Sequence, residues 1–419
     1  MVFDILVMPL NLKSPHYNKF IKLIYLPVKN IKMPNRIKIS LFVILLLAIV
    51  ISCSKNYDSV VSEMASKGQT ALSSEDYREL VRLGIIVEDQ DSPIIKEHKK
   101  NLAKDYNKNV QKTQLFEQYI PLIGANGALD FLEEKFPLCH SQAHDAGRVI
   151  FSKINEIGPS LRACGTRCTS GCMHGILMEA FSELIDEHSG EFEIHIDVED
   201  IKSKVNSICN STEFTRMHKI GNCAHGVGHA FMFLSDYNAS KAVEYCFYFE
   251  SKPLRFYCAS GANMEYVTAK VATVNEIKKS WNYSCEDYSE FPAACYRYKV
   301  ILLFSSLKVA GKKPTINILA DECMKLNNLS RLGCFYGLGF AYLTMIHNKP
   351  SYLREVCSFG NADDQEVCIE GTIEKLADFN ETRALEACQY LDGNNKKVCV
   401  KAAKGGMYRL DKNFRLYFN

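Results

Sequence analysis

The spacing of the cysteines limits the fold of this chain more than any other feature of its sequence. From Cys209 onward the cysteines fall into couples whose members lie 10 to 14 positions apart. The six couples are Cys209 and Cys223, Cys246 and Cys258, Cys285 and Cys295, Cys323 and Cys334, Cys357 and Cys368, and Cys388 and Cys399. The second cysteines, counted from Cys172, recur at intervals of 51, 35, 37, 39, 34 and 31 residues, which is the period of a helical-hairpin repeat. The spacing predicts a disulfide in each hairpin.

The apolar pattern around the couples indicates helices. A short amphipathic stretch precedes the first cysteine, as at residues 352–357 and 382–388. After Cys368, apolar residues at 369, 373, 376 and 377 form the stripe of a buried helix face. We therefore predict an all-α fold of disulfide-stapled helical hairpins, arranged like an α-solenoid. The arrangement loosely resembles tetratricopeptide and Sel1-like repeats, without their signature residues.

Glycine recurs three positions after most of the second cysteines. These residues are Gly175, Gly226, Gly261, Gly337 and Gly371. Glycine inside a helix costs ~1 kcal/mol relative to alanine, so its recurrence indicates a close approach of helices. We interpret Cys-x-x-Gly as a packing motif.

The N-terminal region has the pattern of an export signal. Arg36 and Lys38 precede an apolar run from Ile39 to Ile51, which is shorter than the ~20 residues that a membrane span needs. The run ends in Val50-Ile51-Ser52-Cys53, which resembles the lipobox of bacterial lipoproteins. The resemblance implies acylation of Cys53 and stable attachment to a lipid membrane, because two or more chains would be buried there. An uncleaved signal anchor is the alternative, and either one places most of the chain outside the cytoplasm.

The sequence divides into five parts on this interpretation. Met33 is the expected start, and residues 1–32 are then an extension that does not belong to the signal. A signal peptide at 33–52 is followed by a tether with N-terminal helices at 53–110, a His-bearing helical region at 111–235 and Cys-paired helical repeats at 236–419.

Charge and motifs exclude several classes of function. The 50 basic and 48 acidic residues leave a formal charge of +2, so nothing predicts nucleic-acid binding. No Gly-x-Ser-x-Gly elbow, phosphate-binding loop or dinucleotide fingerprint follows the signal. The sequence does not show whether the protein is an enzyme.

Lipidation of Cys53 would leave 16 of the 17 cysteines for disulfides. Cys139, Cys164, Cys168 and Cys172 lie outside the couples, and their spacing does not determine how they pair. If 164–172 is one helix, three thiols share a face, which leaves two alternatives open, a metal-thiolate site and a redox centre.

Histidine is concentrated in one part of the chain. Six of the 11 histidines lie between positions 140 and 229: His140, His144, His174, His218, His225 and His229. His140 and His144, like His225 and His229, are four positions apart, so each pair shares one helix face and can bind one ion. Asp145 follows His144 as a candidate carboxylate partner for an imidazole.

The repeat register strengthens the histidine signal. Two positions after the second cysteine stand His174 and His225, and in later units Ser260, Arg297 and Tyr336, then Glu370 and Lys401. A packing role would require small or apolar residues throughout, so histidine in adjacent units predicts a local site. The pattern around Cys139, Cys172 and Cys223 resembles that of uncharacterised exported prokaryotic proteins, which implies no function.

We predict that the six histidines form a transition-metal site for metal binding or metal-dependent catalysis on a small substrate. Neutral imidazoles and an exported location favour copper or zinc. Three histidines from each of two segments would also match the ligand count of a dicopper centre. The alternative is a non-catalytic scaffold that binds an envelope protein or a glycan, with histidines that only pack. Convergence of the imidazoles distinguishes the two.

Overall fold

A computed structural model describes residues 74–108, 111–136, 138–182, 184, 198–271, 285, 290–410 and 414–417. All of them belong to one compact unit, Val61–Asn419. The predicted extension, the signal peptide and Cys53 lie outside the described residues.

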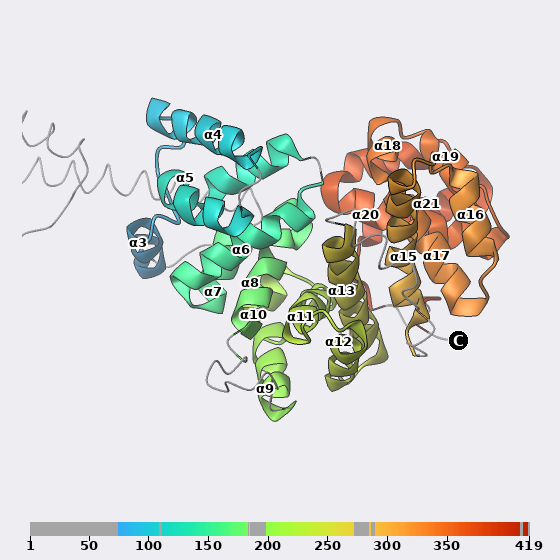
Figure 1. The fold of residues 1–419 in the computed structure, drawn as a ribbon, viewed down its shortest axis with the longest axis horizontal. Coiled ribbons are helices and arrows are strands. Elements are labelled where there is room, and N and C mark those ends of the chain that lie inside the picture. The colour runs from blue at the N-terminus through green and yellow to red at the C-terminus, as the bar shows by residue number, and fades with distance from the viewer. Residues whose placement is uncertain are drawn as a thin grey trace, which may run out of the picture. The chain divides into compact units, whose positions relative to one another are not determined.

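The described residues contain helices and no strand, which confirms the all-α prediction (Figure 1). The helices are α3 (Ser74–Arg82), α4 (Pro93–Tyr106), α5 (Lys112–Lys135), α6 (His140–Ile154), α7 (Ile157–Cys164), η2 (Cys168–Ser170), α8 (Gly171–Ser182), α9 (Val198–Cys209), α10 (Thr212–Met217), α11 (Ile220–Leu234), α12 (Ala239–Tyr245), η3 (Cys246–Tyr248), α13 (Lys252–Val271), α15 (Pro292–Val309), α16 (Ile316–Met324), α17 (Asn328–Ala341), α18 (Leu343–Asn348), α19 (Tyr352–Val356), α20 (Ala362–Cys388) and α21 (Gly393–Gly405). A break in helical geometry at Asn380 divides α20 into two helical parts.

Each of the six predicted cysteine couples forms a disulfide. In five of them the first cysteine lies at or just after the end of a helix, as Cys209 does in α9. The second cysteine lies in the long helix that follows, as Cys223 does in α11. Closing a loop of this size in the unfolded chain stabilises the fold by roughly 2 to 3 kcal/mol per disulfide.

The long helices pack in chain order. Helix α6 contacts α8, which contacts α11, and the series continues through α13, α15, α17 and α20 (Figure 1). Glycine lets successive backbones touch: Gly175 lies against the carbonyl of His144, Gly261 against that of His225, Gly337 against that of Arg297, and Gly371 against that of Tyr336. A Cβ at these four positions would stand 1.8 to 2.1 Å from the carbonyl oxygen, so the Cys-x-x-Gly motif packs helices as predicted.

The last residues of the chain return to the middle of the series. Lys219, just before α11, donates hydrogen bonds to the carbonyls of Gly405 and Met407 at 2.7 and 2.9 Å. The Tyr257 hydroxyl donates to the carbonyl of Arg409 at 2.7 Å. The sequence pattern did not predict this return, because it depends on contacts between positions about 150 to 190 residues apart.

The four cysteines that precede the couples pair as Cys139 with Cys168 and Cys164 with Cys172. Residues 164–172 are not one helix, since α7 ends at Cys164 and η2 separates it from α8. The two alternatives that required free thiols here, a metal-thiolate site and a redox centre of reduced cysteines, are therefore wrong for this disulfide-bonded structure. Eight disulfides indicate an oxidising, extracytoplasmic environment.

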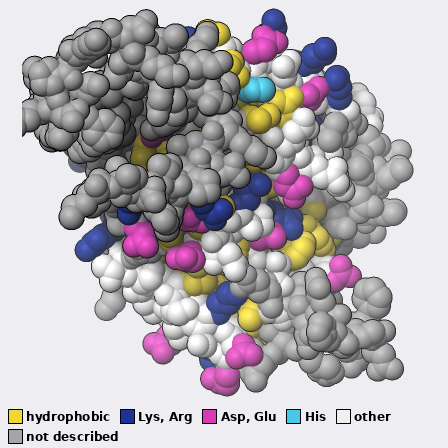
Figure 2. Space-filling view, turned by 90° about the vertical axis from the view of Figure 1, so that its left-hand side faces the viewer, with side chains coloured by type: hydrophobic (Ala, Val, Ile, Leu, Met, Phe, Trp, Pro, Cys, Tyr) yellow, Lys and Arg dark blue, Asp and Glu magenta, His cyan; other side chains and the backbone are white. Residues whose placement is uncertain are grey.

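The surface is mixed in charge where it can be seen. On the face shown in Figure 2, basic and acidic side chains alternate between small hydrophobic areas. Among the helices that the structure describes, none has both the length and the apolar character needed to cross a membrane.

Candidate metal centre

Three consecutive long helices bring the histidines together. His140 and His144 lie in the first turns of α6, His174 in α8, and His225 and His229 in α11. The close approach of α8 to α6, where Gly175 touches the carbonyl of His144, brings His174 beside the α6 pair.

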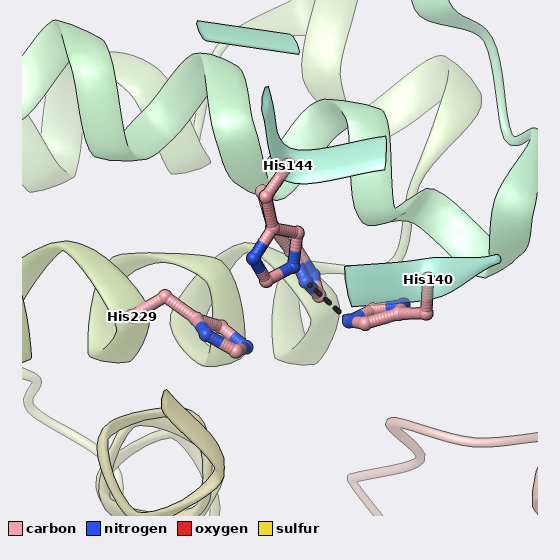
Figure 3. A group of neighbouring side chains, drawn as sticks. His140, His144 and His229 are labelled. Atoms are coloured by element: carbon pink, nitrogen blue, oxygen red, sulfur yellow. Dashed lines mark hydrogen bonds between the residues drawn. The ribbon is translucent and has the colours of Figure 1, made fainter. Parts of the chain in front are cut away.

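Four of the imidazoles converge on one point. Each of His140, His144, His174 and His229 offers one ring nitrogen, and these four nitrogens lie within 4.8 Å of one another. Figure 3 shows the rings of His140, His144 and His229 turned toward a common centre. The four side chains are buried, with 0 to 7% of their surface exposed. This group could hold a metal ion.

The outer nitrogens of two of these rings have defined acceptors. His140 Nδ1 lies 3.0 Å from the carbonyl oxygen of Thr169, which can only accept, so Nδ1 carries the hydrogen. His174 Nε2 donates to Asn222 Oδ1 at 2.9 Å. The remaining nitrogens, His140 Nε2 and His174 Nδ1, therefore both present lone pairs.

One carboxylate serves the other two rings. Glu265 of α13 accepts a hydrogen bond from His229 Nδ1 at 2.9 Å, and the same oxygen lies 3.7 Å from His144 Nδ1. The Nε2 atoms of His144 and His229 are buried and have no hydrogen-bond partner among the described residues. Metal-bound histidines commonly hold their second nitrogen on a carboxylate or a carbonyl in this way.

The inner nitrogens fit a bound cation better than they fit one another. His140 Nε2 and His174 Nδ1 are 3.2 Å apart, and two lone pairs at that distance repel unless a proton or an ion lies between them. Zinc–nitrogen bonds of about 2.0–2.1 Å in a tetrahedral site place neighbouring ligand nitrogens about 3.3 Å apart. The separation of this one pair is close to that value, and all four nitrogens lie within 4.8 Å of one another.

Burial keeps three of these rings, those of His140, His144 and His174, in the neutral form that binds metals. It lowers the pKa of His140 and His174 well below the ordinary range, and that of His144 to about 3. The charges of the neighbouring rings act in the same direction. Burial raises the pKa of Glu265, but the hydrogen bond from His229 together with the charges of His229, His144 and Arg148 outweighs it, and the pKa is lowered overall. An ionised Glu265 would balance part of the charge of a divalent cation.

The other two predicted histidines do not join the group. His225 borders it, with its ring 4.9 Å from that of His229, but its free Nδ1 is not among the converging atoms. His218 lies apart, 3.4 Å from the Ser170 hydroxyl and against the ring of Phe214. The interpretation of two sets of three ligands in a dicopper centre is therefore wrong, because the described histidines form a single group of four.

The carboxylate beside the cluster is not the predicted one. Asp145 accepts a hydrogen bond from Thr113 at 2.8 Å, and no imidazole donates to it among the described residues. Glu265 takes that role, together with Asn222 and Thr169, none of which the sequence singled out. Asn222 can be recognised in the sequence only as the residue before Cys223. Nothing in the local sequence pattern distinguishes Glu265 from a surface glutamate.

No protein-family model, curated protein or solved structure matches this chain. The site's own chemistry therefore carries the functional argument.

Proposed function

We propose that this protein binds one transition-metal ion through His140, His144, His174 and His229. One observation carries the proposal: the four inner nitrogens converge while the outer nitrogens of the rings face acceptors on Thr169, Asn222 and Glu265. That arrangement fixes which nitrogen is free in His140, His174 and His229, as a metal site requires.

Zinc and copper are the metals that fit best. Four imidazoles form a donor set suited to both, and the disulfides indicate a compartment where both ions are accessible. Four protein ligands are typical of structural or storage sites, because a catalytic zinc usually keeps one open position. We therefore propose binding and retention of the ion as the primary function, and catalysis would require one imidazole to leave.

The convergence supports the metal site over the scaffold interpretation. Histidines that only pack have no reason to turn four lone pairs toward one point, since burying unsatisfied polar atoms costs about 1–3 kcal/mol each. Binding of an envelope protein or glycan stays a prediction from the repeat pattern.

We also propose that acylated Cys53 anchors the protein to a lipid membrane outside the cytoplasm. The proposal is supported by the apolar run and the lipobox. Detergent phase partitioning tests it: the wild type should enter the detergent phase and a Cys53→Ala variant should not.

Elemental analysis tests the metal site. The protein is purified without a His tag from an exporting host, incubated with zinc or copper, and freed of excess ion. We expect one ion per chain in the wild type and in His218→Ala, which removes a buried histidine outside the cluster. A folded His174→Ala/His229→Ala variant should lose the ion. A wild type that stays metal-free after exposure to both ions contradicts the proposal.

Cobalt gives a second readout of the same geometry. A tetrahedral Co²⁺ site absorbs visible light far more strongly than an octahedral one. Wild type and His218→Ala should show the intense bands, and the double variant should show only the weak spectrum of hydrated cobalt.

A further inference from the structure

A cavity of about 220 Å³ adjoins the histidine cluster. His140 and Ser141 of α6 line one part of it, and Lys375 and Phe379 of α20 line another. Because His140 also belongs to the cluster, the cavity and the candidate metal centre share a wall.

Most of the cavity wall is apolar. The apolar lining includes Leu138, Met264, Val267, Ile301, Phe340 and Leu343. Such a wall favours a ligand with a hydrocarbon body, because contact removes apolar surface from water. The polar groups are few, and Lys375 is the only cation among the lining residues.

Lys375 is the buried amine of this wall. It is 8% exposed, and its Nζ lies 5.4 Å from the ring of Phe379, which also lines the cavity. Asp378 acts on it only through its charge, and that carboxylate accepts a backbone hydrogen bond from Met407. Burial lowers the pKa of Lys375 to about 8, so the amine still carries its charge at neutral pH. A buried charge is costly, and an anionic ligand would lower that cost.

A second buried cation lies behind the same wall. Arg297 is fully buried, and none of its three guanidinium nitrogens has a hydrogen-bond partner in the described part of the chain. Its guanidinium lies 4.7 to 5.3 Å from the rings of Tyr298, Tyr336 and Phe340, and the first and last of these also line the cavity. The cavity therefore has a positively charged side chain in its lining, Lys375, and another behind its wall, Arg297.

The nearby buried acids are committed to other groups. Glu265 accepts from His229, as described above. Glu374 accepts from the Tyr336 hydroxyl at 2.5 Å and pairs with Arg409 at 2.6 Å. Neither acts on Lys375, whose acidic neighbour is Asp378.

We propose that this cavity binds a small organic carboxylate, with its hydrocarbon part against the apolar wall and its carboxylate on Lys375. A single ammonium suits a monoanion, whereas a phosphate dianion would require more donors than the lining offers. The inference does not depend on the proposed metal site, with which the cavity shares only the side chain of His140.

Calorimetry with three matched probes tests the proposal. Hexanoate, hexanamide and hexylamine share one hydrocarbon chain and differ in charge. Hexanoate should bind at least tenfold more tightly than hexanamide, a difference of about 1.4 kcal/mol, and hexylamine should not bind. Equal binding of hexanoate and hexanamide to the folded wild type overturns the proposal without any variant.

Two variants locate the carboxylate. Lys375→Met removes the charge and keeps the length, and it should abolish the preference for hexanoate. Lys396→Met removes an exposed lysine from α21 and should leave the preference unchanged. If Lys375→Met keeps the preference, the carboxylate lies elsewhere and the proposal is wrong.

The zinc content of each sample is measured in parallel, so the two proposals can fail separately. A protein that binds no zinc but prefers hexanoate through Lys375 contradicts the metal site and supports the cavity. A protein that binds zinc but does not distinguish hexanoate from hexanamide supports the metal site and contradicts the cavity.

Discussion

The hairpins of α6, α8 and α11 and those of α15, α17 and α20 share one backbone design and differ in what they bury. In both regions disulfides close the hairpins and glycine backbones touch the carbonyls of the preceding helix. At the position two residues after the second cysteine, the first region buries His174 and His225, and the second buries Arg297 and Tyr336. In these four units the repeat therefore holds an inward-facing position that accepts histidine, arginine or tyrosine, whereas the equivalent Glu370 is half-buried and Lys401 is exposed.

The largest effect is expected from glycines that both regions need. Gly175→Ala and Gly371→Ala each place a methyl group about 2 Å from a carbonyl oxygen, and overpacking of this kind costs roughly 3 kcal/mol or more. Both variants should unfold at lower urea concentration or not fold. Gly405→Ala is the control, because no atom lies within 4 Å of a Cβ there. A mild effect in only one region would show that the two are packed differently.

Removing one disulfide from each region should lower the free energy of unfolding by two different amounts. The chain-entropy estimate gives about 3.6 kcal/mol for the 29-residue separation of Cys139 and Cys168, and about 2.8 kcal/mol for the 11-residue separation of Cys357 and Cys368. We expect double alanine variants to follow that order in urea unfolding. Only the first should also weaken zinc binding, because Thr169 follows Cys168 and holds His140. Equal zinc affinity in both variants would show that the Cys139–Cys168 disulfide does not influence the histidine cluster.

The acids of the two regions should differ in their effect on metal affinity. Glu265→Gln removes the charge that orients His144 and His229, and such changes typically weaken metal binding 10- to 100-fold. Glu374→Gln in the second region should leave zinc affinity unchanged, since Glu374 pairs with Tyr336 and Arg409. Competition with a chelator of known affinity measures both. Loss of zinc affinity in Glu374→Gln would mean that the regions are coupled.

The smallest effect is expected from a helix cap. The Asn361 side chain accepts from the Asp364 amide, and Asp364 accepts from the Asn361 amide, which forms a capping box for α20. Asn361→Ala should lower the free energy of unfolding by about 1 kcal/mol. Zinc content should not change. A decrease would show that zinc binding depends on the N-terminal cap of α20.

The sequence predicted the features that depend on local spacing. Couples such as Cys357 and Cys368 lie 11 positions apart and join neighbouring helices, so their pairing follows from the repeat. The i, i+4 pair His140 and His144 follows from helix geometry. Glu265 could not be predicted, because α13 reaches the cluster through tertiary packing on α11, where Gly228 meets the carbonyl of Cys258 and Gly261 that of His225. The exclusion of His218 depends equally on tertiary packing.

The returning C-terminal segment is synthesised after every residue of the histidine cluster. A ribosome makes α6, α8, α11 and α13 first, so all four ligands and Glu265 exist long before Tyr408, whose ring lies 5.2 Å from that of His225. A chain truncated before Gly406 would keep His140, His144, His174 and His229 but lose the contact of Tyr408 with His225.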